Sequence, residues 1–308
     1  MKERFEDITA HLYSATDFIR WGASRFAEAG LHYGHGTDNA LDEAVALVLH
    51  ALHLPHGCPD RLLDARLTAG EKAEIYRLLV KRVEDRIPAA YLTGETWFAG
   101  MKFKSDARAL VPRSPIAELV EAHFEPWTDP DAVDSVLDLC TGGGCIAIAC
   151  AHAFPGAAVD AVDLSAEALA LARENVEMHG VGAQVTLYEG DLFAPLPKGR
   201  RYDIIVSNPP YVDADDMAGL PGEFRHEPEL GLAAGDDGLD IARRILAAAA
   251  DWLSESGILV VEVGNSAAAL EDAYPDVDFT WLDFERGGEG VFLLTAAELR
   301  KHVSTFSG

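Results

Sequence analysis

Short apolar stretches alternate with helical stretches along the last two thirds of the chain, and this alternation limits the possible folds more than any other feature. Most of the apolar stretches are rich in Val, Ile and Leu and have the length of buried strands. Seven strands are predicted, at residues 135–139, 158–163, 184–189, 202–207, 257–263, 278–283 and 291–295. Helices are predicted between them at 145–153, 166–179 and 239–254. The pattern indicates an α/β fold with a mainly parallel sheet, covered by helices on both faces. The Gly-rich residues 285–290 predict that the last two strands form an antiparallel hairpin.

The first third of the chain has a helical pattern instead. Apolar residues recur there at helical spacing, and Thr68 and Glu71 form a capping box ahead of a helix that Pro88 closes. Aromatic residues among Thr and Gly follow, which predicts a hairpin or an extended linker. Ser114 and Pro115 predict the start of a short helix that runs to about residue 124. The predicted organisation is a helical domain at 1–88, a hairpin or linker at 89–112, an α/β domain at 113–300 and a tail at 301–308.

The chain is strongly acidic, with 25 Lys and Arg residues against 51 Asp and Glu residues and a formal net charge of −26. This charge opposes sequence-independent binding to nucleic acid, which needs basic side chains that displace phosphate counterions, and it suits a basic partner. No stretch approaches the roughly 20 uncharged apolar residues of a membrane span, and the charged first ten residues do not resemble a signal peptide. We therefore expect a cytoplasmic protein.

The four cysteines are expected to be reduced and to hold no metal. Cys140, Cys145 and Cys150 lie in one local run, where a disulfide framework would be unusual. Their spacing also lacks the C-x2-C pairs of zinc and iron–sulfur sites.

A glycine-rich turn between the first predicted strand and its helix is the first candidate for ligand binding. Gly142, Gly144 and Ala147 satisfy the pattern G-x-G-x-x-G/A, and Asp163 follows Gly144 by 19 residues at the end of the next strand. Glycines let the backbone approach a ligand closely, and the acid can accept hydrogen bonds from ribose hydroxyls. These features alone fit NAD as well as S-adenosylmethionine.

The second candidate is Asn208-Pro209-Pro210-Tyr211, at the carboxyl end of the fourth predicted strand. Two consecutive prolines fix φ and remove two N–H donors, so the loop is rigid and exposes the Asn208 amide and backbone carbonyls. An NH2 group can donate one hydrogen bond to the Asn208 side-chain oxygen and another to the Pro209 carbonyl, while Tyr211 covers its flat face. The loop therefore suits a planar nitrogen substrate, which a dinucleotide dehydrogenase does not have.

Together, DLCTGGGC at 138–145 and NPPY at 208–211 resemble the amino-methyltransferases that use S-adenosylmethionine on planar nitrogen. Residues 88–94, 97–100, 110–118 and 225–232 are similar to the bacterial protein-(glutamine-N5) methyltransferases. Within that family, the Pro-Arg-Ser-Pro-Ile-Ala-Glu and Arg-His-Glu-Pro segments resemble the branch that acts on the third protein of the large ribosomal subunit. One departure is Gly143, where we expect Ser in that branch. The resemblance implies a Rossmann-like seven-strand methyltransferase domain behind a small helical domain for substrate recognition.

The resemblance also implies a role for individual residues. The pocket for the methionine part of the cofactor is expected to be shaped by Asp138, Cys140, Thr141, Gly142 and Gly144. Asp163 is expected to hold the ribose, Asp191 the adenine amino group, and Leu192 the adenine ring. The expected catalytic residues are Asn208, Pro209, Pro210 and Tyr211, with Asn208 also beside the cofactor.

The implied activity is methyl transfer from S-adenosylmethionine to the N5 amide nitrogen of a glutamine in a basic large-subunit ribosomal protein. His226 and Glu227 could accept the released proton, although residues in such a loop more often shape the substrate site or lie on the surface. Three alternatives remain open at this point. They are an amino-methyltransferase of RNA or DNA bases, a member of the release-factor branch, and a non-catalytic assembly factor for the same ribosomal protein.

Overall fold

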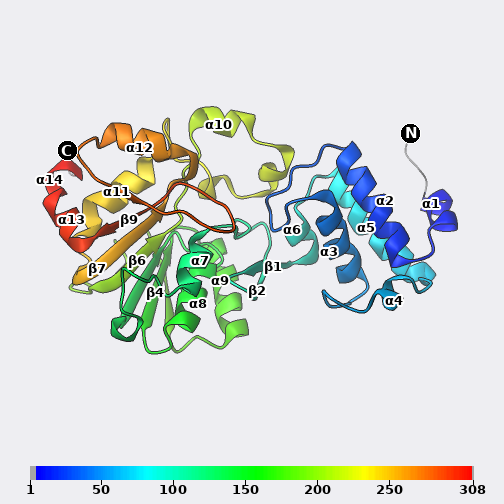
Figure 1. Cartoon of the computed structure of the whole chain (residues 1–308), viewed down its shortest axis with the longest axis horizontal. Helices are drawn as coiled ribbons and strands as arrows, with labels where there is room; N and C mark the ends of the chain where they lie inside the picture. The colour runs from blue at the N-terminus through cyan, green and yellow to red at the C-terminus, as the bar shows by residue number, and fades with distance from the viewer. Residues whose placement is uncertain (1–4, 307–308) are drawn as a thin grey trace. The chain divides into compact units, whose positions relative to one another are not determined.

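The computed structural model describes residues 5–306 and divides them into two units (Figure 1). One unit contains the residues up to Thr96 together with Pro221–His226, and the other contains Trp97–Leu220 and the residues from Glu227 onward. The first four residues of the predicted helical domain and the last two of the predicted tail lie outside the described part of the chain.

Helices build the first unit, as the sequence pattern predicts. Its helices are α1 (Phe5–His11), α2 (Ala15–Glu28), α3 (Ala40–Ala51), α4 (Asp60–Leu63), α5 (Ala69–Glu84) and α6 (Ala89–Thr93). The capping box before α5 is present, because the Thr68 hydroxyl accepts from the Glu71 N–H and the Glu71 carboxylate accepts from the Thr68 N–H. Apolar side chains of α2, α3 and α5 form its core, among them Phe18, Phe26, Leu47, Ile75 and Leu78.

The segment Pro221–His226, distant in sequence, is anchored in this helical unit by buried charges. It contains the 3-10 helix η2 (Gly222–His226), and the Glu223 side chain is fully buried. The Arg82 guanidinium donates to Glu223 Oε1 at 3.1 Å and to Glu43 Oε1 at 2.5 Å. Phe224 packs beside His32 and His35, with ring centroids 5.4 and 4.8 Å apart. Sequence reasoning did not anticipate that this segment belongs with the helices.

The segment predicted as a hairpin or linker at 89–112 begins instead with the short helix α6, which starts directly after Pro88. A hairpin of β1 (Glu95–Phe98) and β2 (Met101–Lys104), which pair with each other, follows it. The short helix predicted to run to residue 124 is α7 (Ile116–Glu121), which ends earlier. The Ser114 hydroxyl accepts from the Ile116 N–H at 3.2 Å and donates to Glu262 Oε2 at 2.5 Å.

The second unit has the seven-strand sheet and fold class that the sequence predicts. Its strands are β3 (Ser135–Leu139), β4 (Ala158–Asp163), β5 (Val185–Glu189), β6 (Tyr202–Ser207), β7 (Leu253–Glu262), β8 (Thr280–Trp281) and β9 (Val291–Thr295). Their order is β5-β4-β3-β6-β7-β9-β8. β3 to β7 are parallel, whereas β9 is antiparallel to both β7 and β8, so the predicted antiparallel hairpin at the end is confirmed.

Several element boundaries differ from the prediction. The helix predicted at 239–254 is α11 (Asp240–Ala249), and β7 begins at Leu253 because this residue pairs with Tyr202 of β6. The strand predicted at 278–283 is reduced to the two residues of β8.

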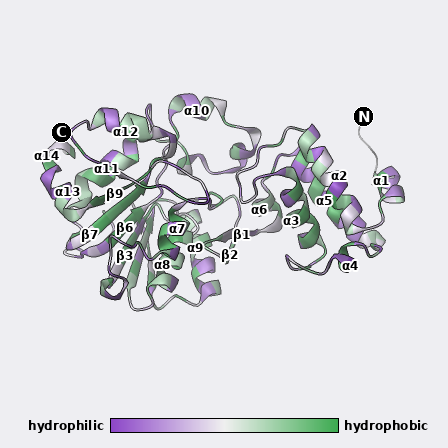
Figure 2. Ribbon diagram, viewed as in Figure 1, coloured by the Kyte–Doolittle hydropathy of each residue, from purple (hydrophilic) through white to green (hydrophobic). Residues whose placement is uncertain are grey.

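Successive strand residues point to opposite faces, so the sheet separates two apolar clusters. Val136, Ile204 and Val260 belong to the cluster that includes α8 (Cys145–Ala153) and α7. Leu137, Ile205 and Val261 belong to the cluster that includes α11 and α13 (Ala296–Lys301). Figure 2 shows the strands of the sheet as hydrophobic, which is the pattern of a sheet buried on both faces.

The remaining helices are α9 (Ala166–His179), α10 (Ala214–Gly219), α12 (Ala267–Ala273) and α14 (Val303–Phe306), with short 3-10 turns η1 (Pro130–Ala132), η3 (Glu229–Gly231) and η4 (Gly264–Ser266). α14 lies in the segment that the sequence reasoning assigned to a tail, and its Phe306 is buried against Tyr274. None of the helices within residues 5–306 has the length and apolar character needed to span a bilayer.

Candidate functional site

The carboxyl ends of four neighbouring strands bring the candidate residues to one edge of the sheet. Leu139 at the end of β3 is paired with Val162 of β4 on one side and with Ser207 of β6 on the other. The chain therefore leaves β3 at the point where the strand order reverses, which is where open α/β sheets bind their ligands. Asp163, the loop from Cys140 to Gly144, and Asn208 follow directly after these paired residues.

The glycine loop between β3 and α8 has a tight and strained backbone. Gly142 and Gly144 have φ of +55° and +81°, and a Cβ on Gly144 would lie 3.2 Å from the Ala172 Cβ. Cys140 has φ of +60°, a value that residues other than glycine rarely adopt. Leu192, after β5, has φ of +48°. Such strain clusters at ligand sites, where surrounding structure imposes it.

Asp138 supports this loop from inside the sheet. Its Oδ2 accepts hydrogen bonds from the Thr141 hydroxyl at 2.5 Å and from the Ala147 N–H at 3.0 Å. Its Oδ1 is buried and has no hydrogen-bond partner within residues 5–306. Burial raises the pKa of Asp138 to about 7, against the lowering effect of the two hydrogen bonds.

Asp163 connects the end of β4 to the glycine loop. One carboxylate oxygen accepts from the Gly142 N–H and the other from the Ser165 N–H, both at 2.8 Å. Burial raises the pKa of Asp163, and these N–H donors act in the opposite direction. A carboxylate has about four lone-pair positions, so Asp163 keeps capacity to accept from two further hydroxyl groups.

These observations fit the cofactor that the sequence resemblance implies. The half-buried Asp163 can accept from a ribose, and within residues 5–306 the buried Oδ1 of Asp138 is a hydrogen-bond acceptor without a partner beneath the loop, which fits a polar ligand there. A Cβ on Gly143 would make an ordinary contact of 3.4 Å with Leu171, so the departure from Ser there does not obstruct the loop.

Asp191 and Leu192 follow β5 at the same edge of the sheet. The Asp191 carboxylate is half-exposed and forms an ion pair of 2.6 Å with Arg244 on α11. Leu192 is buried in the apolar cluster that contains Leu139 and Ile205. Their assignment to adenine remains a prediction.

The Asn208–Tyr211 loop continues from β6, whose last residue is held by the Ser207 hydroxyl donating to the Leu139 carbonyl at 2.8 Å. Pro209 is buried, and Asn208 and Pro210 are half-buried. The loop thus combines a fixed backbone with a partly accessible amide, which is the combination needed to orient a small polar group.

Tyr211 is held through both its ring and its carbonyl. Its hydroxyl donates to Glu262 Oε1 at 3.1 Å, and its carbonyl accepts from the Ser266 hydroxyl at 3.0 Å. A Cβ on Gly264 would lie 2.6 Å from the Tyr211 ring. Burial and the neighbouring Glu262 raise the pKa of Tyr211 well above its ordinary value, so the phenol is a hydrogen-bond donor at neutral pH.

The two residues considered as proton acceptors have other contacts. A ring nitrogen of His226 lies 2.7 Å from the Asp85 carbonyl in the helical unit. Glu227 is buried in the α/β unit and accepts from both terminal nitrogens of Arg113, at 2.7 and 2.9 Å, and from the Val111 N–H. Both side chains hold loop segments in place.

Sequence reasoning missed the part that Glu262 and Ser114 play at this site. The sequence predicts Ser114 only as a helix cap, and for residues 262–265 it leaves a structural turn and a functional one equally open, with no partner for Glu262. The signal that could have found Glu262 is a charged residue that directly follows a run of buried Val residues.

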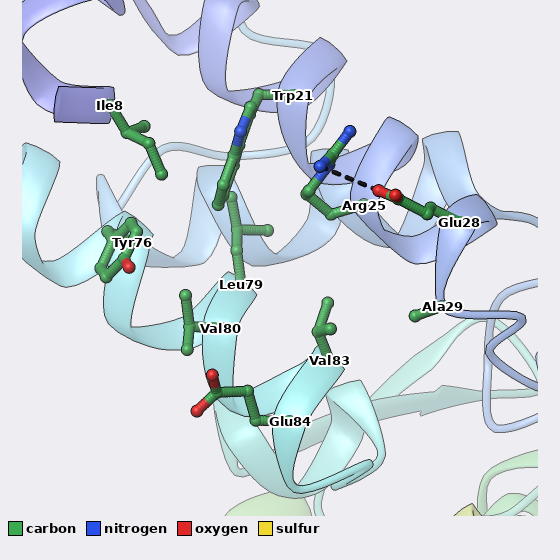
Figure 3. A pocket seen from close by; sticks show the side chains of 10 residues that line it. All are labelled: Ile8, Trp21, Arg25, Glu28, Ala29, Tyr76, Leu79, Val80, Val83 and Glu84. Carbon is green, nitrogen blue, oxygen red and sulfur yellow. Dashed lines mark ion pairs between the residues drawn. The ribbon is translucent and has the colours of Figure 1, made fainter. Parts of the chain in front are cut away.

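A separate groove lies within the helical unit (Figure 3). Its volume is about 270 Å³, and its apolar wall includes Trp21, Tyr76 and Val83. Arg25 and Glu28 form an ion pair of 2.8 Å at its margin. The groove contains none of the residues assigned to the cofactor or to the Asn208–Tyr211 loop.

Comparison with known proteins gives the family. A family model described as "Methyltransferase small domain" matches residues 123–220. The chain is 55% identical to the ribosomal protein uL3 glutamine methyltransferase of Xanthomonas campestris pv. campestris over 292 residues, 94% of each protein. It is 51% identical to the protein of the same name from Burkholderia pseudomallei, covering 92% of this chain and 94% of that protein. The corresponding protein of Xylella fastidiosa is 53% identical and covers 94% of this chain and 93% of its own length. These similarities confirm the resemblance inferred from the motifs, and the chain belongs to the family of ribosomal protein uL3 glutamine methyltransferases.

Proposed function

We propose that the chain transfers a methyl group from S-adenosylmethionine to the side-chain amide nitrogen of a glutamine in the large-subunit ribosomal protein uL3. The observation that carries this proposal is the pairing of β3 with both β4 and β6, which brings the glycine loop, Asp163 and Asn208 to adjacent strand ends. The family supports the substrate, because its named members act on uL3. A ribosomal substrate favours a cytoplasmic location.

When bound, S-adenosylmethionine supplies an electrophilic methyl group. In this proposal the loop from Cys140 to Gly144 holds its methionine part, with Asp138 beneath the loop. Asp163 accepts from the ribose hydroxyls. Asp191 and Leu192 line the adenine.

The Asn208–Tyr211 loop orients the glutamine. An amide nitrogen is a poor nucleophile because its lone pair is delocalised into the carbonyl, so orientation is a large part of what the enzyme can contribute. The Asn208 side-chain oxygen and the Pro209 carbonyl accept the two amide hydrogens, and their dipoles favour the positive charge that develops on nitrogen in the transition state. Pro210 fixes this geometry, and Tyr211 covers the face of the amide.

The net charge favours this substrate over a nucleic acid. The chain carries a formal net charge of −26, which repels phosphate backbones and attracts a basic ribosomal protein. The acidic side chains of α10, Asp215 and Asp216, are exposed shortly after the Asn208–Tyr211 loop and add to this attraction.

The test is substitution of Asn208 followed by single-turnover methyl transfer from radiolabelled S-adenosylmethionine to purified uL3. Asn208→Ala removes one of the two acceptors and should lower the rate about 100- to 1,000-fold, the effect of losing one hydrogen-bonding group that acts mainly in the transition state. Asn208→Asp keeps an acceptor and tests whether the amide NH2 is needed. The affinity for S-adenosylmethionine should change little in either variant.

Asn265→Ala is the matched control, since it removes an exposed amide near the end of the neighbouring β7 and should leave the rate unchanged. Fragmentation mass spectrometry should locate the added methyl on a glutamine of uL3. A methyl on lysine or on RNA would contradict the proposed substrate class, and unaltered rates in both Asn208 variants would remove that residue from the orienting role.

A further inference from the structure

A buried carboxylate next to the Asn208–Tyr211 loop has no role in the mechanism described so far. Glu262 is the last residue of β7 and only 5% exposed. Its Oε1 accepts from the Tyr211 hydroxyl at 3.1 Å, and its Oε2 accepts from the Ser114 hydroxyl at 2.5 Å. Burial of a carboxylate is costly, so a carboxylate retained at this position needs a reason.

The surroundings of Glu262 limit the orientation of the Tyr211 ring. The ring lies against Gly264, where any side chain would collide with it. The Tyr211 carbonyl is fixed by Ser266, and a Cβ on Gly238 would lie 2.3 Å from that carbonyl. Backbone packing thus holds one side of the residue, and the hydroxyl at the far end of the ring is held by Glu262.

We propose that Glu262 is a positioning residue that fixes the orientation of Tyr211 for methyl transfer. The inference rests on the proposed function, since Tyr211 is the residue expected to cover the substrate amide. A carboxylate is suited to this task because it accepts a hydrogen bond more strongly than a neutral group. Ser114, held by the same carboxylate, fixes its rotamer in turn.

A second physical effect follows from the charge of Glu262. Methyl transfer moves positive charge toward the amide nitrogen, and an aromatic face attracts a cation within about 6 Å of the ring centroid. A phenol that donates to a carboxylate carries a more electron-rich ring than one that donates to water. Glu262 would therefore act on the transition state more than on substrate binding, so its loss should lower kcat more than it raises KM.

The experiment compares Glu262→Ala, Glu262→Gln and Tyr211→Phe with the Glu262→Ala/Tyr211→Phe double variant. Glu262→Ala and Tyr211→Phe should each lower kcat about 10- to 100-fold, the range for losing a hydrogen bond to a charged group. The double variant should lose no more than either single variant, because both remove the same interaction. Glu262→Gln keeps an acceptor for the Tyr211 hydroxyl, so this variant should retain most of the activity that Glu262→Ala loses. Additive losses, or a Gln variant as poor as the Ala variant with its fold intact, would overturn the proposal.

Glu255→Ala is the matched control, because it removes an exposed carboxylate from the same strand and should leave kcat unchanged. A second readout needs no substrate and so separates this inference from the proposed function. In protein labelled with 13C at its tyrosine rings, the Tyr211 resonances, assigned by their loss in Tyr211→Phe, should shift and average in Glu262→Ala but not in Glu255→Ala. Unchanged Tyr211 resonances would contradict the inference, whereas a wild-type enzyme that fails to methylate glutamine would contradict only the proposed function.

Discussion

Replacement of Arg82 by Met should destabilise the helical unit by about 3 to 5 kcal/mol, the range for removing one partner of a buried ion pair. The Arg82 side chain is 1% exposed, and the Glu43 and Glu223 side chains that it joins are 1% and 0% exposed. Its third contact is the His32 carbonyl at 2.8 Å. Met fills a similar volume without the charge, so the variant retains packing but leaves two buried carboxylates without their common cation.

The stability of this variant should depend on pH less steeply in acid than the stability of the wild type. In the wild type, burial raises the pKa of Glu223, but the His32 N–H and Arg82 outweigh it, so the pKa lies below its ordinary value of 4.5. The Glu223 carboxylate therefore stabilises the wild type fully above pH 4.5, and this contribution decreases as the pH falls through the lowered pKa. The variant loses the lowering effect of Arg82 on the pKa of Glu223 but keeps the His32 N–H and Arg86, which lies 3.2 Å from Glu223 Oε1. The pKa of Glu223 should therefore move up toward its ordinary value, and the loss of stability in acid should become smaller.

Hydrogen exchange of α5 peptides measures this locally, which matters because a chain with two units need not unfold in one step. The slowest α5 amides should exchange about 100- to 5,000-fold faster in Arg82→Met, the equivalent of the expected free-energy change. Arg77→Met on the same helix is the control, because Arg77 is 47% exposed and its pair with Glu74 should contribute less than about 1 kcal/mol. Equal effects of the two substitutions, or an Arg82→Met loss that does not vary with pH, would refute the reasoning.

Two further outcomes are expected. Asp163→Ala removes an acceptor from the proposed ribose site and should weaken S-adenosylmethionine binding by roughly ten- to a hundredfold in calorimetry; unchanged affinity would exclude that role. Raising the salt concentration from about 50 to about 500 mM should lower kcat/KM for uL3 several-fold without changing kcat, because salt screens the attraction between an acidic enzyme and a basic substrate; a kcat/KM that does not vary with salt would argue against electrostatic steering.

Local pattern was sufficient to predict most of the sheet. The strands β3, β4, β6 and β9 begin and end at the predicted residues, because each is an apolar run bounded by polar residues, Gly or Asp. The start of β7 was predicted four residues late, since Leu253 belongs to the strand only through its pairing with Tyr202. Pairing across the sheet leaves no mark in the local sequence.

Prediction of the site was likewise limited to features that the local sequence shows. Asp163 and Asn208 could be predicted because Asp163 ends one predicted strand and Asn208 directly follows another, and parallel strands end at one edge. The hydrogen-bond partners of Glu262 and Glu223 could not be predicted, because Ser114 lies 148 residues from Glu262 and Arg82 lies 141 residues from Glu223. Buried polar contacts of this kind are selected by three-dimensional packing rather than by sequence spacing.

The return of Pro221–His226 to the helical unit has a consequence for anyone who exchanges modules within this family. The polypeptide passes from one unit to the other after Thr96, after Leu220 and again after His226, so the helical unit is discontinuous in sequence. A chimera that replaces only the amino-terminal helices would set a foreign surface against the native Glu223 and Phe224, whose partners are Arg82, His32 and His35. A functional graft would have to carry the six-residue segment with the helices, and the crossings after Leu220 and after His226 would then set the boundaries of that segment.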